Sequence, residues 1–333
     1  MTVVDIHSHL FPRSYIELLR RRNTPPRVVG ERGDERLVTF PEETGNTGRP
    51  ITEAFWDVGV KLAFMEQEGI DQTLVTLGNP WLDPFPDGLD VAWSLNEEFA
   101  ALATSTGGRI LGAGVLPLDL EDALRVAEEV ATAEGLFGLV AGPRICDRTL
   151  DDAALDPLWT SLERLELPLL IHPKGERALH DLGGYGGALP VGIGFPFETT
   201  VAVARLTLAG VFERHPGLRL VASHGGGTLP YLAGRLDMVW RTNEHLHARL
   251  QSPPSESLQR LHVDSLVYAP RAIRAATDLV GTGRMMFGTD HPWSSSSRDA
   301  VDAALEGEQL HAVLGGTATV VWGLPSPKLR SPH

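Results

Sequence analysis

The stretch LPLLIHP, residues 167–173, is a short apolar run that ends in a histidine and a proline. Apolar runs without polar alternation are typical of strands in a parallel sheet that helices cover on both faces. The segment before it, residues 151–166, has apolar residues at helical spacing. Together the two segments predict a helix that leads into a buried strand, which is the repeating unit of an α/β protein.

The same unit recurs along the whole chain. Gly or Pro-Gly closes several of the helical segments, as expected of helix C-termini. The predicted strands are residues 3–7, 72–77, 110–116, 136–142, 167–172, 218–224, 261–267 and 284–290. The predicted helices are residues 57–69, 90–108, 120–135, 151–166, 198–217 and 270–281, with two more that begin near Thr228 and near residue 297.

Eight strands that each precede a helix predict an α/β fold of the (β/α)₈ TIM-barrel type, formed as a single domain by residues 1–333. An open, doubly wound parallel sheet is the alternative. Two stretches interrupt the alternation: residues 20–56 are rich in Arg, Pro, Gly and Glu, and residues 174–196 are rich in Gly. They follow strands one and five of the barrel, so we expect active-site insertions over its C-terminal mouth. Passive surface loops are the other interpretation.

Composition limits the classes of function. The 333 residues carry a formal net charge of −14 at pH 7, which argues against nucleic acid or acidic lipid as partners of a basic surface. The longest apolar runs are too short to span a bilayer, and no secretory signal is expected from the N-terminal residues. Cys146 is the single cysteine, so no internal disulfide can form, and a reducing compartment, the cytoplasm, is expected.

Polar side chains end four of the predicted strands. His7 and His9 stand two residues apart, and such residues of a strand share a face, so both could chelate one cation. His172, His224 and Asp290 end three further strands. A barrel brings the C-terminal ends of its strands to one mouth, where imidazoles and a carboxylate suit Zn²⁺, Mn²⁺ or another divalent first-row ion. Hydrogen-bonded polar residues without a metal are the alternative.

These residues stand in motifs that resemble the amidohydrolase superfamily of metal-dependent (β/α)₈ enzymes. Within it, the chain is similar to the branch that contains aminocarboxymuconate semialdehyde decarboxylase and related aromatic-acid decarboxylases. The resemblance covers nearly the whole chain and is most specific from Phe195 to Asp237. The absence of a fourth-strand lysine suited to carboxylation fits the mononuclear branch. The matching motifs are DIHSHLFP, LPLLIHP, GFPFETT, GVFERHPGLRLVASHGGGTLPYLAGRLD, VDSLVYAP and MMFGTDHPW.

The resemblance implies a role for each of these residues. His224 would be a general acid/base beside the metal, and Asp290 is a second candidate acid. The ligands of one divalent ion, Zn²⁺ with Mn²⁺ as the alternative, would be His7, His9, His172 and Asp290.

The resemblance also implies how a small anionic carboxylic acid would be bound. Arg235 matches an arginine that grips the substrate carboxylate, in some relatives from the neighbouring subunit of a homodimer; the alternative is a surface helix arginine. Arg49 loosely matches a first-loop arginine. Lys174 replaces an aromatic residue of the semialdehyde decarboxylases, so it could bind an anionic group or point to solvent.

Four kinds of weaker candidate remain. Asp264 could orient an imidazole from outside the ligand set. His291 is expected to be structural, since it follows Asp290 and would point away from the same strand face. Five further histidines are expected to be structural or exposed: His180, His215, His245, His247 and His262. The aromatic residues that could wall a substrate, or fill the core instead, are Trp81, Phe85, Phe195 and Trp293.

The function expected from these residues and the resemblance is metal-dependent, non-oxidative decarboxylation of an unsaturated or aromatic carboxylic acid. Either His224 would deprotonate a water that adds to a conjugated double bond, or His224 or Asp290 would protonate the ring carbon first. The same apparatus could instead hydrolyse an amide, ester or lactone, or hydrate a dienoic acid. A non-catalytic barrel would carry degenerate metal positions, and none is degenerate here.

Overall fold

The computed structural model describes residues 2–39, 48–78, 82, 85, 88–175, 182, 185–294 and 296–326. Eight parallel strands form one sheet, in the order in which they occur along the chain. Each strand lies within a predicted stretch, except that the first extends to His9. The strands are β1 (Val4–His9), β5 (Gln72–Thr76), β6 (Ile110–Val115), β7 (Leu136–Ala141), β10 (Leu169–Ile171), β11 (Leu220–Ala222), β12 (His262–Asp264) and β13 (Met285–Met286).

The segment after β13 returns to β1 and closes the sheet. The Ile6 N–H donates to the Phe287 carbonyl at 3.0 Å, and the Asp290 N–H donates to the His7 carbonyl at 2.7 Å. An open sheet would leave these groups of the first strand unpaired at an edge. The prediction of a (β/α)₈ barrel is therefore confirmed, and the doubly wound alternative is wrong.

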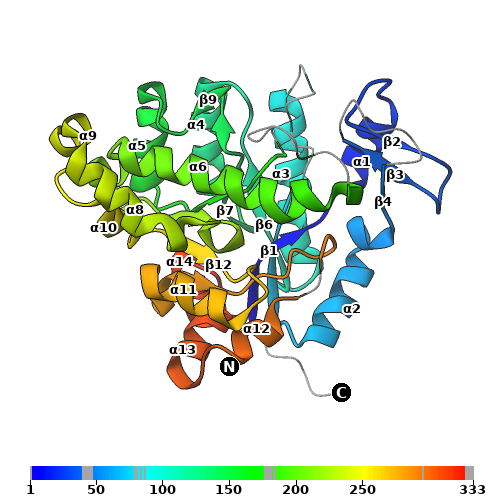
Figure 1. Ribbon diagram of the computed structural model, residues 1–333. Helices are drawn as coiled ribbons and strands as arrows, with labels where there is room; N and C mark the ends of the chain where they lie inside the picture. The colour runs from blue at the N-terminus through cyan, green and yellow to red at the C-terminus, as the bar shows by residue number, and fades with distance from the viewer. Residues whose placement is uncertain are drawn as a thin grey trace.

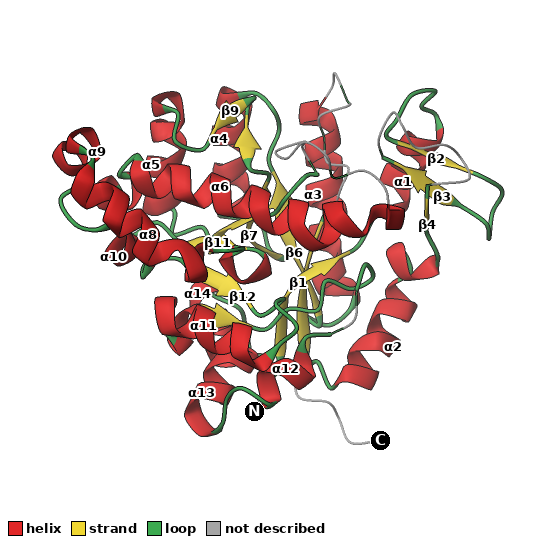
Figure 2. Ribbon diagram, in the orientation of Figure 1, coloured by secondary structure: helices red, strands yellow, loops and turns green. Residues whose placement is uncertain are grey.

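The barrel strands are buried on both faces, as their apolar sequences predict. Leu169, Leu170 and Ile171 of β10 are all inaccessible to solvent. One face of such a strand packs in the barrel interior and the other against the helices. Figure 2 shows the yellow strands surrounded by red helices.

Helices follow the strands and form the outer layer of the barrel (Figure 1). Their ends obey the expected chemistry: Asp57 accepts a hydrogen bond from the Val60 N–H at the start of α2, and Gly69 ends it in the left-handed conformation. The predicted helices correspond to α2 (Val58–Glu68), α3 (Gly88–Ser105), α4 (Leu120–Val130), α5 (Asp156–Arg164), α6 (Phe195–Leu208) with α7 (Val211–Arg214), α8 (Leu229–Thr242), α11 (Pro270–Val280) and α12 (Arg298–Asp302). Shorter helices are α9 (Glu244–Arg249), α10 (Pro254–Leu258), α13 (Gly307–His311) and α14 (Thr317–Trp322).

The two interrupting stretches contain structure that the sequence did not predict. Helix α1 (Arg13–Arg20) precedes a small antiparallel sheet of β2 (Arg27–Val29), β3 (Arg36–Val38) and β4 (Arg49–Pro50). This sheet lies beside α1 and away from the barrel strands in Figure 1. Within residues 174–196, a short helix η4 (Pro190–Gly194) runs directly into α6. Residues 40–47, 176–181 and 183–184 lie outside the described part of both stretches.

Two further findings complete the fold. A short hairpin of β8 (Arg144–Ile145) and β9 (Arg148–Thr149) follows β7, which the sequence did not predict. Within the described part of the chain, none of the helices combines the length and apolar content that a membrane span requires.

Candidate metal centre

His7 and His9 lie at the carboxyl end of β1, and both side chains are fully buried. They share a face of the strand because they are two residues apart. Two glycines on neighbouring segments leave room for the imidazoles. A Cβ on Gly288 would lie 3.0 Å from His7 Cβ, and one on Gly78 would lie 3.2 Å from His9 Nδ1. A side chain at either glycine would crowd an imidazole, and a neighbouring group would have to shift by a few tenths of an ångström.

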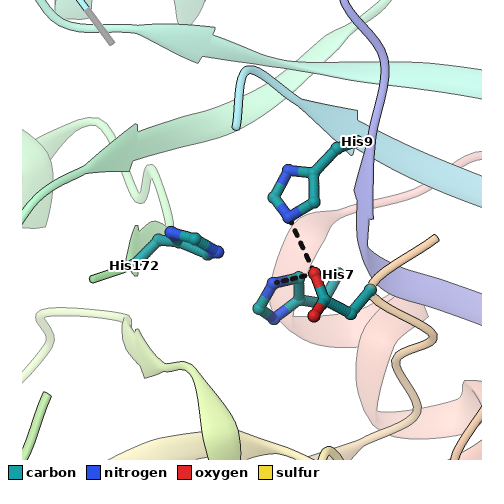
Figure 3. A group of neighbouring side chains, drawn as sticks. His7, His9 and His172 are labelled. Carbon is teal, nitrogen blue, oxygen red and sulfur yellow. Dashed lines mark ion pairs between the residues drawn. The ribbon is translucent and has the colours of Figure 1, made fainter. Parts of the chain in front are cut away.

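His172 and Asp290 complete a cluster with this pair. His172 follows β10, and Asp290 lies in the segment that closes the barrel. One donor atom from each of the four residues lies within 4.8 Å of the others. The three imidazoles face one another in Figure 3, with ring centroids 4.9–5.2 Å apart. Asp290 Oδ1 lies 3.1 Å from His9 Nε2 and 3.7 Å from His7 Nε2.

Each of the three imidazoles has a partner within the protein at its Nδ1 atom. His7 Nδ1 is 2.6 Å from Asp264 Oδ2, and His172 Nδ1 is 2.7 Å from the Pro173 carbonyl oxygen. His9 Nδ1 is 3.1 Å from the Thr76 hydroxyl. These contacts direct the Nε2 atoms toward the centre. An Nδ1–H bonded to a carboxylate or carbonyl, with Nε2 on the ion, is the usual arrangement of a metal-binding histidine.

Two buried nitrogens of the cluster lack a hydrogen bond. Among the described residues, neither His7 Nε2 nor His9 Nε2 has a hydrogen-bond partner of suitable geometry. Leaving a buried polar atom unsatisfied costs about 1–3 kcal/mol. A cation bound by the three Nε2 atoms and a carboxylate oxygen would remove this cost. The residues present therefore fit a divalent first-row ion, for which three imidazoles and one carboxylate are a suitable donor set.

Burial sets most of the protonation states. It lowers the pKa of His9 to about 4, and it lowers the pKa of His172 and of His224 below the ordinary value. Burial also opposes ionisation of Asp290, but its contact with His9 and the nearby His7 and His224 hold its pKa below the usual range. Neutral imidazoles and an ionised carboxylate are the forms that bind a cation.

Asp264 joins His7 to the segment that follows β11. Besides the His7 ring, its carboxylate accepts hydrogen bonds from the backbone N–H groups of His224 at 2.9 Å and Gly225 at 2.9 Å. Burial favours the neutral carboxyl, but these contacts lower the pKa of Asp264. Burial likewise favours neutral His7, yet its bond to Asp264 raises the pKa of His7. The prediction that Asp264 orients an imidazole agrees with this geometry.

His224 lies beside the cluster without completing it. Its ring centroid is 5.5 Å from that of His7 and 5.8 Å from that of His172. Its Nδ1 is buried and has no hydrogen-bond partner among the described residues. His224 and Asp290 both adopt positive φ, at 55° and 57°, which costs a residue with a Cβ about 1–3 kcal/mol. Such strain is concentrated at functional sites, where a side chain must take a particular direction.

The predicted substrate-binding residues occupy different places. The Arg49 guanidinium lies 5.3 Å from the centre of the Trp293 ring, against the segment that carries Asp290. The Lys174 stem lies against Gly142, where a Cβ would be 2.3 Å from Lys174 Cε. Glu198 of α6, which is buried, accepts a hydrogen bond from the Lys174 N–H at 3.0 Å. Arg49 and Lys174 therefore both lie at the carboxyl end of the barrel.

Arg235 is not brought to the cluster within this chain by any ion pair or hydrogen bond among the described residues. It is exposed on α8, and Tyr231 and Met238 are exposed on the same helix. Residues three and four apart share a helix face, so Arg235 lies in a stripe with these two apolar side chains.

The weaker candidates mostly pack in the core. His291 stacks on Phe64, with ring centroids 3.9 Å apart, and Phe85 packs against Tyr15. Trp293 is half-buried. It lies near His9, because a Cβ on Gly78 would be 3.1 Å from Trp293 Nε1 and 3.2 Å from His9 Nδ1. Trp81 lies outside the described residues. The sequence analysis missed Lys61, a fully buried lysine that contacts His291.

Comparison with known proteins agrees with the fold and the motifs. The chain is 27% identical over 296 residues to 2-amino-3-carboxymuconate-6-semialdehyde decarboxylase of Dictyostelium discoideum, covering 87% of this chain and 81% of that protein. It is 27% identical over 321 residues to gamma-resorcylate decarboxylase of Rhodococcus jostii, covering 85% and 95%. The structure resembles that of Metarhizium anisopliae IDCase in apo form, with a TM-score of 0.88, 33% identity and 97% coverage of both chains.

The family assignment follows from the extent of the match. Residues 4–324 match the family described as Amidohydrolase, which includes every strand of the barrel and all the residues of the cluster. This chain therefore belongs to the amidohydrolase family, in the branch of the semialdehyde and resorcylate decarboxylases.

Proposed function

We propose that this protein is a metal-dependent, non-oxidative decarboxylase of a small unsaturated or aromatic carboxylic acid. The buried cluster of His7, His9, His172 and Asp290 carries this proposal. One donor atom from each residue lies within 4.8 Å of the others, and the Nε2 atoms of His7 and His9 have no hydrogen bond of suitable geometry among the described residues. The names of the two similar curated proteins, both decarboxylases, support the reaction class.

The ion would be Zn²⁺, with Mn²⁺ as the alternative, held by the four residues of the cluster. When bound, it would orient the substrate and stabilise the negative charge that develops as carbon dioxide leaves. The residues around the ion would position its ligands. Asp264 would hold the His7 ring, and Gly78 and Gly288 would keep the space that the imidazoles need.

His224 would move the proton in this reaction. Its ring lies close to the cluster, and its Nδ1 has no hydrogen-bond partner among the described residues. Because burial lowers the pKa of His224, the imidazole is neutral and can accept a proton from a reacting group at neutral pH. Asp290 is the second candidate for proton transfer to the substrate carbon.

Three cationic residues would bind the substrate acid. Arg49 and Lys174 would do so from insertions 20–56 and 174–196, which would then flank the mouth. Arg235 would reach the site of a second subunit in a homodimer. The dimer is supported by Tyr231 and Met238, the exposed apolar residues around Arg235 on α8. Exposed apolar patches of this kind mark interaction surfaces.

The remaining assignments follow the sequence. We infer one domain over residues 1–333, since the matched family extends across nearly all of the chain. A cytoplasmic location is inferred from the single cysteine.

The test is release of carbon dioxide from a panel of aromatic and muconate-type acids. Metal-loaded protein should release it, whereas metal-stripped protein and Asp290→Ala should not. Asp302→Ala, which removes a partly exposed carboxylate bound to Arg298, is the control and should behave as the wild type. If metal-loaded protein releases no carbon dioxide, product analysis with esters, lactones and dienoic acids decides between hydrolysis and hydration.

A further inference from the structure

Lys61 of α2 is the largest charged side chain that the described structure buries completely. Its ammonium group makes three contacts: Ser8 Oγ at 2.8 Å, His291 Nδ1 at 2.6 Å and the His291 carbonyl oxygen at 3.1 Å. Ser8 stands between His7 and His9, and His291 follows Asp290. A single ammonium group therefore joins the two segments that carry three of the four candidate ligands.

The two segments meet at one carbonyl group. Besides the Lys61 ammonium, the His291 carbonyl accepts hydrogen bonds from the His9 N–H at 2.8 Å and from Ser8 Oγ at 3.2 Å. The acceptor belongs to the residue next to Asp290, and the other donors belong to the strand of His7 and His9. Any shift of this carbonyl would therefore change the distance between Asp290 and the histidine pair.

Helix α2 holds His291 by a second contact. Phe64 stacks on the His291 ring with ring centroids 3.9 Å apart and an interplanar angle of 23°. Lys61 and Phe64 are three residues apart, so they project from the same face of the helix. The imidazole of His291 is thus fixed in its plane by Phe64 and at Nδ1 by Lys61.

The cost of this arrangement argues against a role in packing alone. Burying an ammonium group costs several kcal/mol, and apolar residues of similar size often stabilise an interior better. Burial accordingly lowers the pKa of Lys61 to about 7, while the carboxylates of Asp5 and Asp290 oppose that shift. A methionine would fill the same space at lower cost, but it could not bind three acceptors.

We propose that Lys61 is a positioning residue of the metal centre, which sets the distance between Asp290 and the pair His7 and His9 by binding Ser8 and His291 together. This inference rests on the proposed function, since it assumes that the cluster binds a divalent ion. Residues that orient metal ligands from outside typically contribute about 10–100-fold to metal affinity.

The experiment is calorimetric titration of metal-stripped protein with Mn²⁺ and Zn²⁺, well below the melting temperature. Lys61→Met keeps the length of the stem and removes the three donors, so affinity should fall about 10–100-fold in a protein with native circular dichroism. Leu162→Ala is the matched control, because it destabilises the fold from α5, which carries no candidate ligand. It should bind metal as the wild type does.

Ser8→Ala is the second variant, for the case that Lys61→Met does not fold. It removes one acceptor of Lys61 and one donor to the His291 carbonyl, so its affinity should also fall. Wild-type affinity in folded Lys61→Met, or in Ser8→Ala if only that variant folds, would overturn the proposal. Equal losses in the Lys61 and Leu162 variants would overturn it too. A wild type that binds neither metal would instead overturn the proposed function itself.

Discussion

Two places in the fold hold buried histidines whose ring nitrogens have different contacts. His215, between α7 and β11, has both nitrogens near carboxylates: Nδ1 is 3.3 Å from Glu163 and Nε2 is 3.3 Å from Asp156. His7 and His9 at the barrel mouth have partners at Nδ1 but no hydrogen bond at Nε2 among the described residues. Burial alone is therefore no sign of function; His7 and His9 differ from His215 because they offer donor atoms that lie within 4.8 Å of those of His172 and Asp290.

Removing one histidine from the cluster and the histidine between α7 and β11 tests this distinction most directly. His172→Ala should lose bound metal and lower turnover by about 10³-fold or more, since a metal ion contributes several kcal/mol to the transition state. His215→Ala should keep its metal and its turnover, and lose roughly 1–3 kcal/mol of stability with its two hydrogen bonds. Metal content by mass spectrometry, turnover and urea denaturation measure these effects. Loss of metal from the His215 variant would contradict the distinction.

A His224 variant tests whether a buried ring nitrogen without a hydrogen bond is always a metal ligand. His224→Ala should retain metal yet lose about 10²–10⁴-fold in turnover, which is the usual contribution of a general acid/base. Parallel measurements of metal content and turnover separate the two roles. Metal loss on the scale of His172→Ala would make His224 a ligand, and wild-type turnover would remove it from the mechanism.

An Asp264 variant tests the importance of the hydrogen-bond partner at His7 Nδ1. Asp264→Asn keeps the size of the side chain but weakens its hold on His7 and on the His224 backbone, so metal affinity should fall about 10–100-fold. Titration of the stripped protein measures this change. Asp156→Asn, at the partner of His215, is the control that should leave metal affinity unchanged.

His9 should also make the stability of the metal-free protein depend on pH. The pKa of His9 is lowered to about 4 from 6.5 by burial, so between these values the unfolded chain binds a proton that the folded chain does not. Stability should therefore fall as pH drops through this window, by about 3 kcal/mol for His9 over the whole window and by about 2 kcal/mol between pH 7 and pH 5. Denaturation of metal-free wild type and His9→Gln at pH 7 and pH 5 measures the contribution. An equal pH dependence in both proteins would contradict it.

The barrel and the cluster could be predicted from local pattern because both depend on strand ends. Each of the apolar runs became a strand, and closure of the sheet brought His7, His9, His172 and Asp290 together. The sheet of β2, β3 and β4 escaped prediction because its strands are only two or three residues long. Such lengths are too short for a periodic signal.

Lys61 escaped prediction for a different reason. It stands in VGVKLAFMEQE, an ordinary helical sequence in which a lysine normally faces solvent. Only the distant residues Ser8 and His291 reveal its role, and no spacing along the chain relates them. Arg235 shows the opposite limit: the resemblance implies contact with substrate, but the structure leaves this side chain exposed on α8.

The hydrogen bonds between β1 and the segment after β13, which close the barrel, have a consequence for the order of folding. Ser8 and His291 are 283 residues apart, and His7 and Asp264 are 257 apart. Strand β1 and the segment after β13 must meet before the cluster exists, and contacts of such sequence separation form slowly. During synthesis, His7 and His9 could meet Asp264 and Asp290 only after those later residues have left the ribosome. Metal binding would therefore report on completion of the barrel, and an ion that arrives then would join the first and last strands.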